Sequence, residues 1–220
     1  MDDPFGPLEE TIHRSVSIGS PQPYEAFRTI HEPLSVLYPA SAHDATPATV
    51  FKNTTFVDTD EAAIRTLKTA GYRAHHRDIR DYRAHEPHDL LILLNPEVPA
   101  SWATPHLAPG GYVLANDYHG SARELNETEG FELIATIDRD GVVSRDLEGL
   151  FEPIDMDELA RERPESFQAM RTQRDIFIEE GRLDAKADDT EELKWRSFFK
   201  ATEIAPYRRT APFYVFQKNR

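Results

Sequence analysis

Residues 34–60, LSVLYPASAHDATPATVFKNTTFVDTD, contain two predicted strands joined by a loop of small and polar residues and a short helical connection. The strands are residues 35–38 and 54–57, and the second runs directly into Asp58. Asp60 is placed to cap a following helix. Strand, loop, helical connection, strand and acid is the order found in the first half of a nucleotide-binding α/β domain. In such a domain, Asp58 could accept hydrogen bonds from two ribose hydroxyls.

Strands and helices continue to alternate beyond this stretch. Strands are predicted at 72–77, 89–95, 112–115 and 131–137, with helices at 61–70, 101–107 and 121–129. The apolar run DLLILLN at 89–95 is typical of a central strand whose two faces are both covered. The alternation predicts an α/β fold with a Rossmann-like doubly wound, mainly parallel sheet and right-handed crossovers. Residues 109–111, Pro-Gly-Gly, are predicted to form the turn into the strand at 112–115.

The pattern divides the chain into an N-terminal arm and a single domain. Residues 1–22 have no sustained period and are predicted to be extended or disordered, whereas residues 23–220 form the domain. The domain opens with a short helix. Its expected packing face carries residues at three- and four-residue spacing, namely Tyr24, Phe27, Ile30 and Leu34.

A helical insertion at 138–211 interrupts the alternation before the last strand. Its parts are a loop or short hairpin at 138–153, a helix at 156–181 broken at Pro164, and an amphipathic helix at 188–200. The last strand, PFYVFQK at 212–218, is rich in β-branched and aromatic residues. We expect it to be an edge strand, antiparallel beside the strand at 131–137, with the insertion lying over the sheet as a cover.

The composition is strongly acidic. The 220 residues include 25 lysines and arginines and 39 aspartates and glutamates, which gives a formal charge of -14, and arginine supplies most of the positive charge. Such a surface is typical of a halophilic protein from a high-salt cytoplasm, although an ordinary acidic cytosolic protein has a similar balance. Binding to a nucleic-acid backbone needs a basic stripe, so nucleic acid is not expected as a partner.

Further classes are excluded by what the sequence lacks. It has no cysteine, which excludes disulfides, thiolate metal sites and cysteine nucleophiles. No apolar run approaches the roughly 18 residues of a membrane span, and residues 1–10 do not resemble a signal peptide. We therefore expect a cytoplasmic protein without a membrane partner. The sequence leaves open whether the chain forms a homo-oligomer.

Residues 34–137 together with 212–218 resemble the class I S-adenosylmethionine-dependent methyltransferase fold, whose last strand is antiparallel. The similar motifs are VLYPASAHD at 36–44, FVDTDEAAI at 56–64, RDI at 77–79, LLILLNP at 90–96 and PGGYVLAND at 109–117. YPAS, TPATVF, FVDTD and NDYHG together are also similar to a prokaryotic branch of this fold that has no assigned substrate. The family normally has a glycine-rich first motif, whereas residues 38–44 contain no glycine.

The resemblance implies S-adenosylmethionine as the cofactor and a small molecule as the methyl acceptor. The cofactor-binding positions that it implies are Tyr38, Pro39, Ala40 and Ser41 in the first loop, Asp58 and Thr59 at the ribose, and Asp78 and Ile79 at the adenine. Asp58 could instead cap the following helix, although Asp60 is better placed for that role. Asp78 could instead pair with a neighbouring arginine, Arg77 or Arg80.

Three residues are candidates for catalysis. Asp117, Tyr118 and His119 follow the predicted fifth strand at its ligand-binding edge, where a general base could lie, with Asp117 and His119 the expected catalytic residues. A solvated loop would also explain the three residues. Asn95 and Pro96 resemble the motif of methyltransferases that act on amide or amino nitrogens, although Glu97 departs from it and a plain turn would also explain the pair. Asp117 and His119 could also bind a metal, but no third ligand is placed by the sequence, so no metal site is predicted.

Two other functions remain open. A catalytically silent protein of the same fold could act as a binding or assembly module, which the absent glycine loop favours. A Rossmann-type protein could use another nucleotide such as a nicotinamide cofactor, but the G-x-G-x-x-G fingerprint of such proteins is missing.

Overall fold

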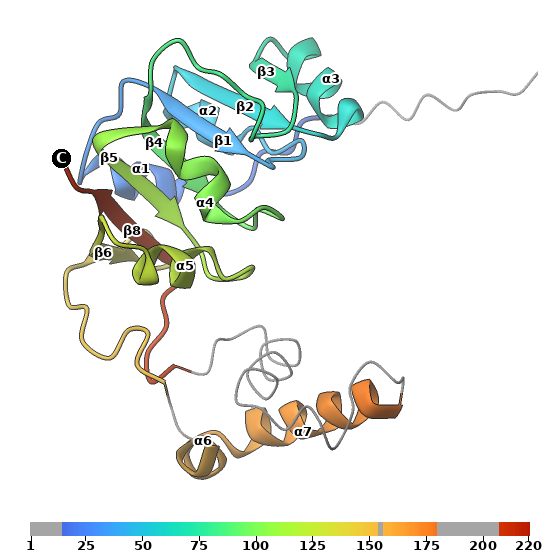
Figure 1. Ribbon diagram of the computed structural model, residues 1–220, viewed down its shortest axis with the longest axis vertical. Helices are drawn as coiled ribbons and strands as arrows, with labels where there is room; N and C mark the ends of the chain where they lie inside the picture. The colour runs from blue at the N-terminus through green and yellow to red at the C-terminus, as the bar shows by residue number, and fades with distance from the viewer. Residues whose placement is uncertain (1–14, 154–155, 180–206) are drawn as a thin grey trace, which may run out of the picture.

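A computed structural model describes residues 15–153, 156–179 and 207–220 (Figure 1), and one eight-stranded sheet runs through them. Its strands are β1 (Val36–Pro39), β2 (Thr54–Asp58), β3 (Arg73–His76), β4 (His88–Leu93), β5 (Leu107–Ala115), β6 (Phe131–Ile137), β7 (Val143–Ser144) and β8 (Phe213–Lys218). The helices are α1 (Gln22–Arg28), α2 (Thr46–Val50), α3 (Glu61–Thr69), α4 (Ala100–Ala103), the 3-10 helix η1 (Thr104–His106), α5 (Ser121–Glu127), α6 (Met156–Glu162) and α7 (Pro164–Glu179). No described helix is long and apolar enough to cross a membrane.

The strand order is β3-β2-β1-β4-β5-β8-β6-β7, with β1 to β5 parallel. This confirms the predicted doubly wound, mainly parallel sheet with an antiparallel last strand. The prediction that the last strand lies at the edge is wrong, because β8 is inserted between β5 and β6 and pairs antiparallel with both. Tyr214, Val215 and Phe216 explain this position. They are at most 1% exposed although they alternate between faces, so both sides of β8 must be covered.

The core lies on both faces of the sheet. Along β1, Val36 and Tyr38 pack into one cluster and Leu37 into the other, as the two-residue period of a strand requires. Residues of α1 and α3 complete the first cluster, and residues of α4 and α5 complete the second. The predicted cap of α3 is confirmed, since the Asp60 carboxylate accepts hydrogen bonds from the N–H groups of Ala62 and Ala63.

Two local predictions were wrong. Leu34 is 81% exposed and does not pack, because α1 ends at Arg28 and the helical spacing no longer applies beyond it. Residues 109–111 are not a turn but lie inside β5, which begins at Leu107. A Cβ at Gly111 would lie 3.0 Å from the Asp89 carbonyl oxygen, so glycine at 111 permits close packing of β5 on β4 where their register shifts.

The described part of the N-terminal segment is attached to the loop after β1. The Ser17 N–H donates to the His43 carbonyl and the Ala45 N–H donates to the Ser17 carbonyl, both at 2.9 Å. The Gly19 N–H donates to the Thr46 hydroxyl oxygen at 2.7 Å. Residues 15–19 therefore run beside this loop, and α1 begins at Gln22, the last residue of the predicted arm. Residues 1–14 of that arm lie outside the described residues.

Helices α6 and α7 form a helical extension that projects away from the sheet (Figure 1), so these two helices are not the predicted cover. Pro164 separates them, as predicted, whereas the helix predicted at 188–200 lies outside the described residues. The extension joins the sheet through a neck made of residues 149–153 and 207–209. Leu150 is paired with Arg209 there, and Pro153 with Tyr207.

Candidate functional site

The carboxyl ends of β1, β2, β4 and β5 lie at the edge of the sheet where β8 begins (Figure 1). In open α/β sheets, ligands bind outside the carboxyl ends of the strands, at the point where the strand order reverses. The order here reverses between β1 and β4. The loops that follow these strands carry most of the residues predicted to form the site.

The loop after β1 has a left-handed backbone at Ala40 and Ala42, with φ angles of 49° and 48°. The Ala40 N–H donates to the Val57 carbonyl at 2.9 Å, and the Ala42 N–H donates to the Asp58 carboxylate at 2.8 Å. Glycine adopts this conformation without steric cost, whereas the alanine Cβ crowds the carbonyl oxygen that follows it. The loop thus has a glycine-type backbone although residues 38–44 contain no glycine.

We expect Ala42→Gly to raise the free energy of unfolding by roughly 0.5–1 kcal/mol. Relief of the left-handed strain, about 1–2 kcal/mol, outweighs the added freedom of glycine in the unfolded chain. Ala62→Gly in α3 is the matched control and should lower the free energy of unfolding by about 0.5–1 kcal/mol. Urea unfolding measures both variants, and equal destabilisation by the two substitutions would contradict the strain at Ala42.

Asp58 connects this loop to the end of β2. One oxygen of its carboxylate accepts the Ala42 N–H, and the other accepts the Asp60 N–H at 2.8 Å. Asp60 caps α3, so Asp58 is not needed for that role. Thr59 is exposed, and its carbonyl lies 2.9 Å from His76 Nε2. The half-buried Asp58 carboxylate retains lone pairs that a ribose could use.

The remaining residues predicted to bind the cofactor in the loop after β1 have buried side chains. Tyr38, Pro39 and Ser41 are buried. The Tyr38 hydroxyl donates to the Asp44 carboxylate at 3.2 Å, and burial raises the pKa of Tyr38 well above its ordinary value. Asp44 in turn accepts the Thr46 N–H at 2.9 Å. These side chains hold the loop in place, so a ligand here would contact mainly its backbone.

Asp78 is engaged by Arg80, which confirms the pairing considered from the sequence. The Arg80 guanidinium donates to both carboxylate oxygens, at 3.0 and 2.6 Å, and lies 4.0 Å from the centre of the Trp102 ring. Hydrogen bonds from Arg80 lower the pKa of Asp78 to about 2. Ile79 is 4% exposed, and its carbonyl lies 2.9 Å from His106 Nε2. This part of the edge therefore presents an ion pair stacked on an aromatic ring.

Asn95 and Asn116 link the loops that follow β4 and β5. The Asn95 N–H donates to the Asn116 side-chain oxygen at 3.0 Å, and the Asn116 amide donates to the Asn95 side-chain oxygen. Asn95 has a left-handed backbone with a φ of 53°, which asparagine tolerates better than most residues. The turn after β4 is therefore built by this pair, with the Asn95 side chain exposed at the edge.

Asp117 is the most unusual carboxyl in the site. It is 9% exposed, and one of its oxygens accepts the Arg123 N–H at 2.9 Å while the other is buried without a hydrogen-bond partner. Burial raises the pKa of Asp117 to about 6. A carboxyl with a pKa near neutrality is suited to accept a proton in a reaction at neutral pH. The solvated loop considered from the sequence does not describe Asp117.

His119 and Tyr118 are exposed, and their rings are 4.8 Å apart. His119 is therefore at the same edge as Asp117 but in contact with solvent. Among the described residues, no group of three or more histidine, cysteine, aspartate or glutamate side chains could hold a metal ion.

Sequence reasoning missed the aromatic residues that surround this edge. Trp102 was predicted only to lie in a short helix and Tyr214 only in the last strand, and no role was predicted for Tyr207. Phe151 lies 5.4 Å from Tyr207 and 4.9 Å from Tyr214, measured between ring centres. The one feature of the sequence that indicates the cluster of Phe151, Tyr207 and Tyr214 is the large number of aromatic residues in and near the last strand.

Comparison with known proteins gave no match to any protein-family model or to any curated protein sequence. Solved structures do match. The N-methyltransferase NodS from Bradyrhizobium japonicum, in complex with S-adenosyl-L-homocysteine, is 19% identical with a TM-score of 0.36, over 42% of this chain and 58% of NodS. CalS10, an S-adenosylmethionine-bound amino pentose methyltransferase from Micromonospora echinaspora, is 20% identical with a TM-score of 0.37, over 44% of this chain and 51% of CalS10.

The O-methyltransferase domain StiE O-MT is 13% identical with a TM-score of 0.48, over 90% of this chain and 73% of that domain. The match to NodS and CalS10 spans little more than half of each of those proteins. All three TM-scores are below 0.5, so the fold is assigned from the strands themselves. Five parallel strands followed by an antiparallel strand inserted beside the sixth give this chain the class I methyltransferase fold.

Proposed function

We propose that the protein binds S-adenosylmethionine at the edge formed by β1, β2 and β4 and transfers its methyl group to a small molecule. The observation that carries this proposal is the left-handed backbone at Ala40 and Ala42, tied to Asp58 through the Ala42 N–H. The left-handed residues bring the loop backbone to Asp58, so a ligand at this edge would meet both the main chain and a carboxylate able to accept hydrogen bonds from ribose hydroxyls.

The residues present fit the cofactor best at its ribose. Asp58 and Thr59 would lie beside the ribose, and the backbone of residues 39–42 beside the methionine portion. At the adenine end, Ile79 would supply an apolar contact, but an adenine amino group would compete with Arg80 for the oxygens of Asp78. The bound cofactor would supply an activated methyl group.

Asp117 and His119 are the proposed bases, and Asn95 the proposed contact for the acceptor. Methyl transfer needs alignment of the acceptor with the methyl group, and a base when the acceptor begins protonated. Asp117 is the stronger candidate because its second oxygen is buried without a protein partner. Because that oxygen is buried, a hydroxyl or amino group of the acceptor could donate its hydrogen to it only after the surrounding side chains move.

A catalytically silent binding module is the alternative. It is favoured by the contacts of the two acids that would bind the cofactor, because Asp58 already bonds backbone N–H groups and Asp78 already pairs with Arg80. Under this alternative, the two carboxylates serve only to hold their own loops.

Calorimetric titration with S-adenosylhomocysteine distinguishes the two functions. We expect micromolar binding in molar potassium chloride, the condition that the acidic composition suggests, and loss of at least tenfold in affinity for Asp58→Ala. Asp60→Asn is the matched control, because it removes a neighbouring charge while asparagine still caps α3, and it should bind as the wild type does. Neither heat nor thermal stabilisation of the wild-type protein at millimolar ligand would contradict the methyltransferase.

A further inference from the structure

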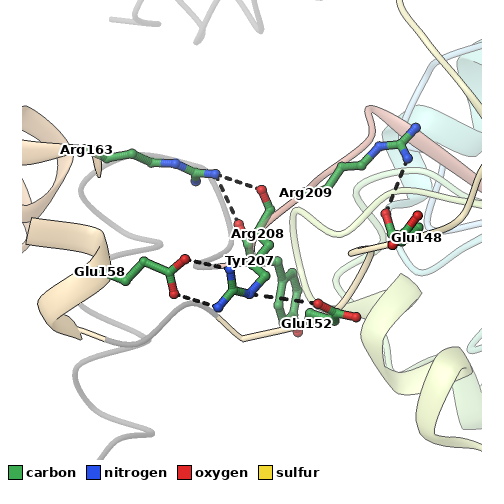
Figure 2. Close-up of polar contacts among 7 residues, drawn as sticks. All are labelled: Glu148, Glu152, Glu158, Arg163, Tyr207, Arg208 and Arg209. Carbon is green, nitrogen blue, oxygen red and sulfur yellow. Dashed lines mark hydrogen bonds and ion pairs between the residues drawn. The ribbon is translucent and has the colours of Figure 1, made fainter. Parts of the chain in front are cut away.

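The neck holds the helical extension through a cluster of arginines (Figure 2). The Arg208 guanidinium donates to both carboxylate oxygens of Glu158, at 2.6 and 2.7 Å, and lies 3.8 Å from Glu152. The Glu158 side chain is 10% exposed and that of Arg208 50%, so the two-pronged pair is buried on the side of Glu158 and open to water on the side of Arg208. Arg163 donates to the carbonyl oxygens of Tyr207 and Arg208, at 3.2 and 3.1 Å. Helix α6 and the Arg163 that follows it are therefore fastened to residues 207–208 of the neck.

The Tyr207 side chain continues this connection toward the sheet. Tyr207 is 5% exposed, and its ring meets that of Phe151, which in turn meets that of Tyr214. Tyr214 lies on β8 and pairs with Ala115 of β5. Ala115 precedes Asp117 by two residues in the sequence. Burial is the main cause of the raised pKa of both Tyr207 and Tyr214, and the charge of Asp117 adds to it.

The backbone of the neck is strained at the centre of this contact. Phe151 has a φ of 60°, a left-handed conformation that is rare for a bulky side chain and persists only where surrounding contacts impose it. Those contacts include the hydrogen bond from the Arg208 N–H to the Glu152 carbonyl at 2.9 Å. The aromatic contact between the neck and β8 is thus imposed by the neck rather than by the local preference of Phe151.

We propose that Tyr207 is a positioning residue for the proposed base, held beside Asp117 by the Arg208–Glu158 pair, so that the neck keeps water away from the Asp117 carboxyl. The proposal deepens the proposed function, because it names a part of the chain outside the sheet on which the base depends. It makes the attachment of α6 a condition for the unusual environment of Asp117.

Asp117 faces titratable groups on several elements, and their effects differ in sign. Burial is the main cause of its raised pKa, and Glu127 of α5 adds to it. Arg123 acts in the opposite direction through its charge and its N–H. The phenols of Tyr207 and Tyr214 remain neutral well above pH 7, because burial raises the pKa of Tyr214 to about 12 and that of Tyr207 further. Removal of the neck from Asp117 should therefore act mainly by admitting water.

The test is a carboxyl carbon NMR titration of Asp117, with its signal assigned by its absence in Asp117→Asn. We expect an apparent pKa near 6 in the wild type and a fall of at least one unit toward 3.8, a tenfold or larger loss of proton affinity, in Arg208→Gln and Tyr207→Ala. Tyr207→Phe keeps the ring in place and should retain the raised value. Arg28→Gln is the matched control, because it also removes one arginine from an ion pair, the exposed pair with Glu32.

An unchanged Asp117 titration in Arg208→Gln and Tyr207→Ala, with folding verified by near-ultraviolet circular dichroism, would overturn the proposal. An equal shift in Arg28→Gln would overturn it too, because the effect would then be general. Calorimetry with S-adenosylhomocysteine on the same variants separates this outcome from failure of the proposed function. Absence of cofactor binding in all of them would contradict the methyltransferase, whereas the Asp117 titration would still report on the neck.

Discussion

Asp117→Asn should make the protein more stable at pH 7 while lowering methyl transfer by roughly a hundredfold to ten-thousandfold, the usual contribution of a general base. Asparagine keeps the acceptor for the Arg123 N–H but cannot take a proton from a substrate. Affinity for S-adenosylhomocysteine should be unchanged, because Asp117 lies at the end of β5 rather than at the loop after β1. Product formation under single-turnover conditions and calorimetry measure the two quantities.

The stability gain should depend on pH. Folding raises the pKa of Asp117 from 3.8 to about 6, so the folded protein binds this proton more tightly than the unfolded chain does. The stabilising contribution of this carboxyl is fully present below pH 3.8 and is lost as the pH rises to about 6. Above pH 6 the charged carboxylate makes the folded state less stable, by up to about 3 kcal/mol, than a neutral side chain would. The difference in free energy of unfolding between variant and wild type should therefore grow from pH 4 to pH 7.

Urea unfolding at several pH values measures this difference. His88 titrates with the opposite effect, because burial lowers its pKa to about 4 and stability then rises with pH between 4 and 6.5. His88 is present in both proteins, so its contribution cancels in the comparison. A difference that is constant from pH 4 to pH 7 would contradict the raised pKa of Asp117.

Leu37→Ala should lower the free energy of unfolding by about 2–5 kcal/mol, enough to unfold much of the protein at 37 °C. Leu37 lies at 0% exposure in the middle of β1, and its removal leaves a cavity against β2 and β4 that the rigid sheet cannot close. Leu34→Ala, three residues earlier, is the matched control. Leu34 is 81% exposed, so its truncation should change stability by less than about 0.5 kcal/mol. A comparable loss of free energy of unfolding in the two variants would contradict the structure between α1 and β1, in which Leu34 is exposed and Leu37 is buried.

The strands of the sheet could be predicted because each of them has a local signal in the sequence. DLLILLN at 89–95 is apolar throughout, and β6 was predicted with its observed bounds, Phe131–Ile137. The position of β8 in the sheet could not be predicted. FYVF is apolar on both faces, and this pattern fits an interior strand as well as an edge strand that is covered by a helix. The neighbours of β8 come from residues about 80 to 100 positions away, and no local pattern reports such pairing.

The candidate site was predicted in its location but not in its details. Asp60 and its role as a cap follow from short-range preferences, and the structure agrees. The left-handed backbone at Ala40 and Ala42 could not be inferred from alanine, whose own preference is against it. Nothing in the sequence around Asp117 signals its burial, and the proposed dependence on Tyr207 would join residues 90 positions apart in the sequence.

A crystal structure of the protein grown with S-adenosylhomocysteine tests the central claim most directly. The account predicts ligand density at the edge between β1 and β4, with the ribose hydroxyls on the Asp58 carboxylate and the amino acid portion against the backbone of residues 39–42. An empty edge at saturating ligand, with the Asp58 carboxylate bound only to the N–H groups of Ala42 and Asp60, would contradict the claim.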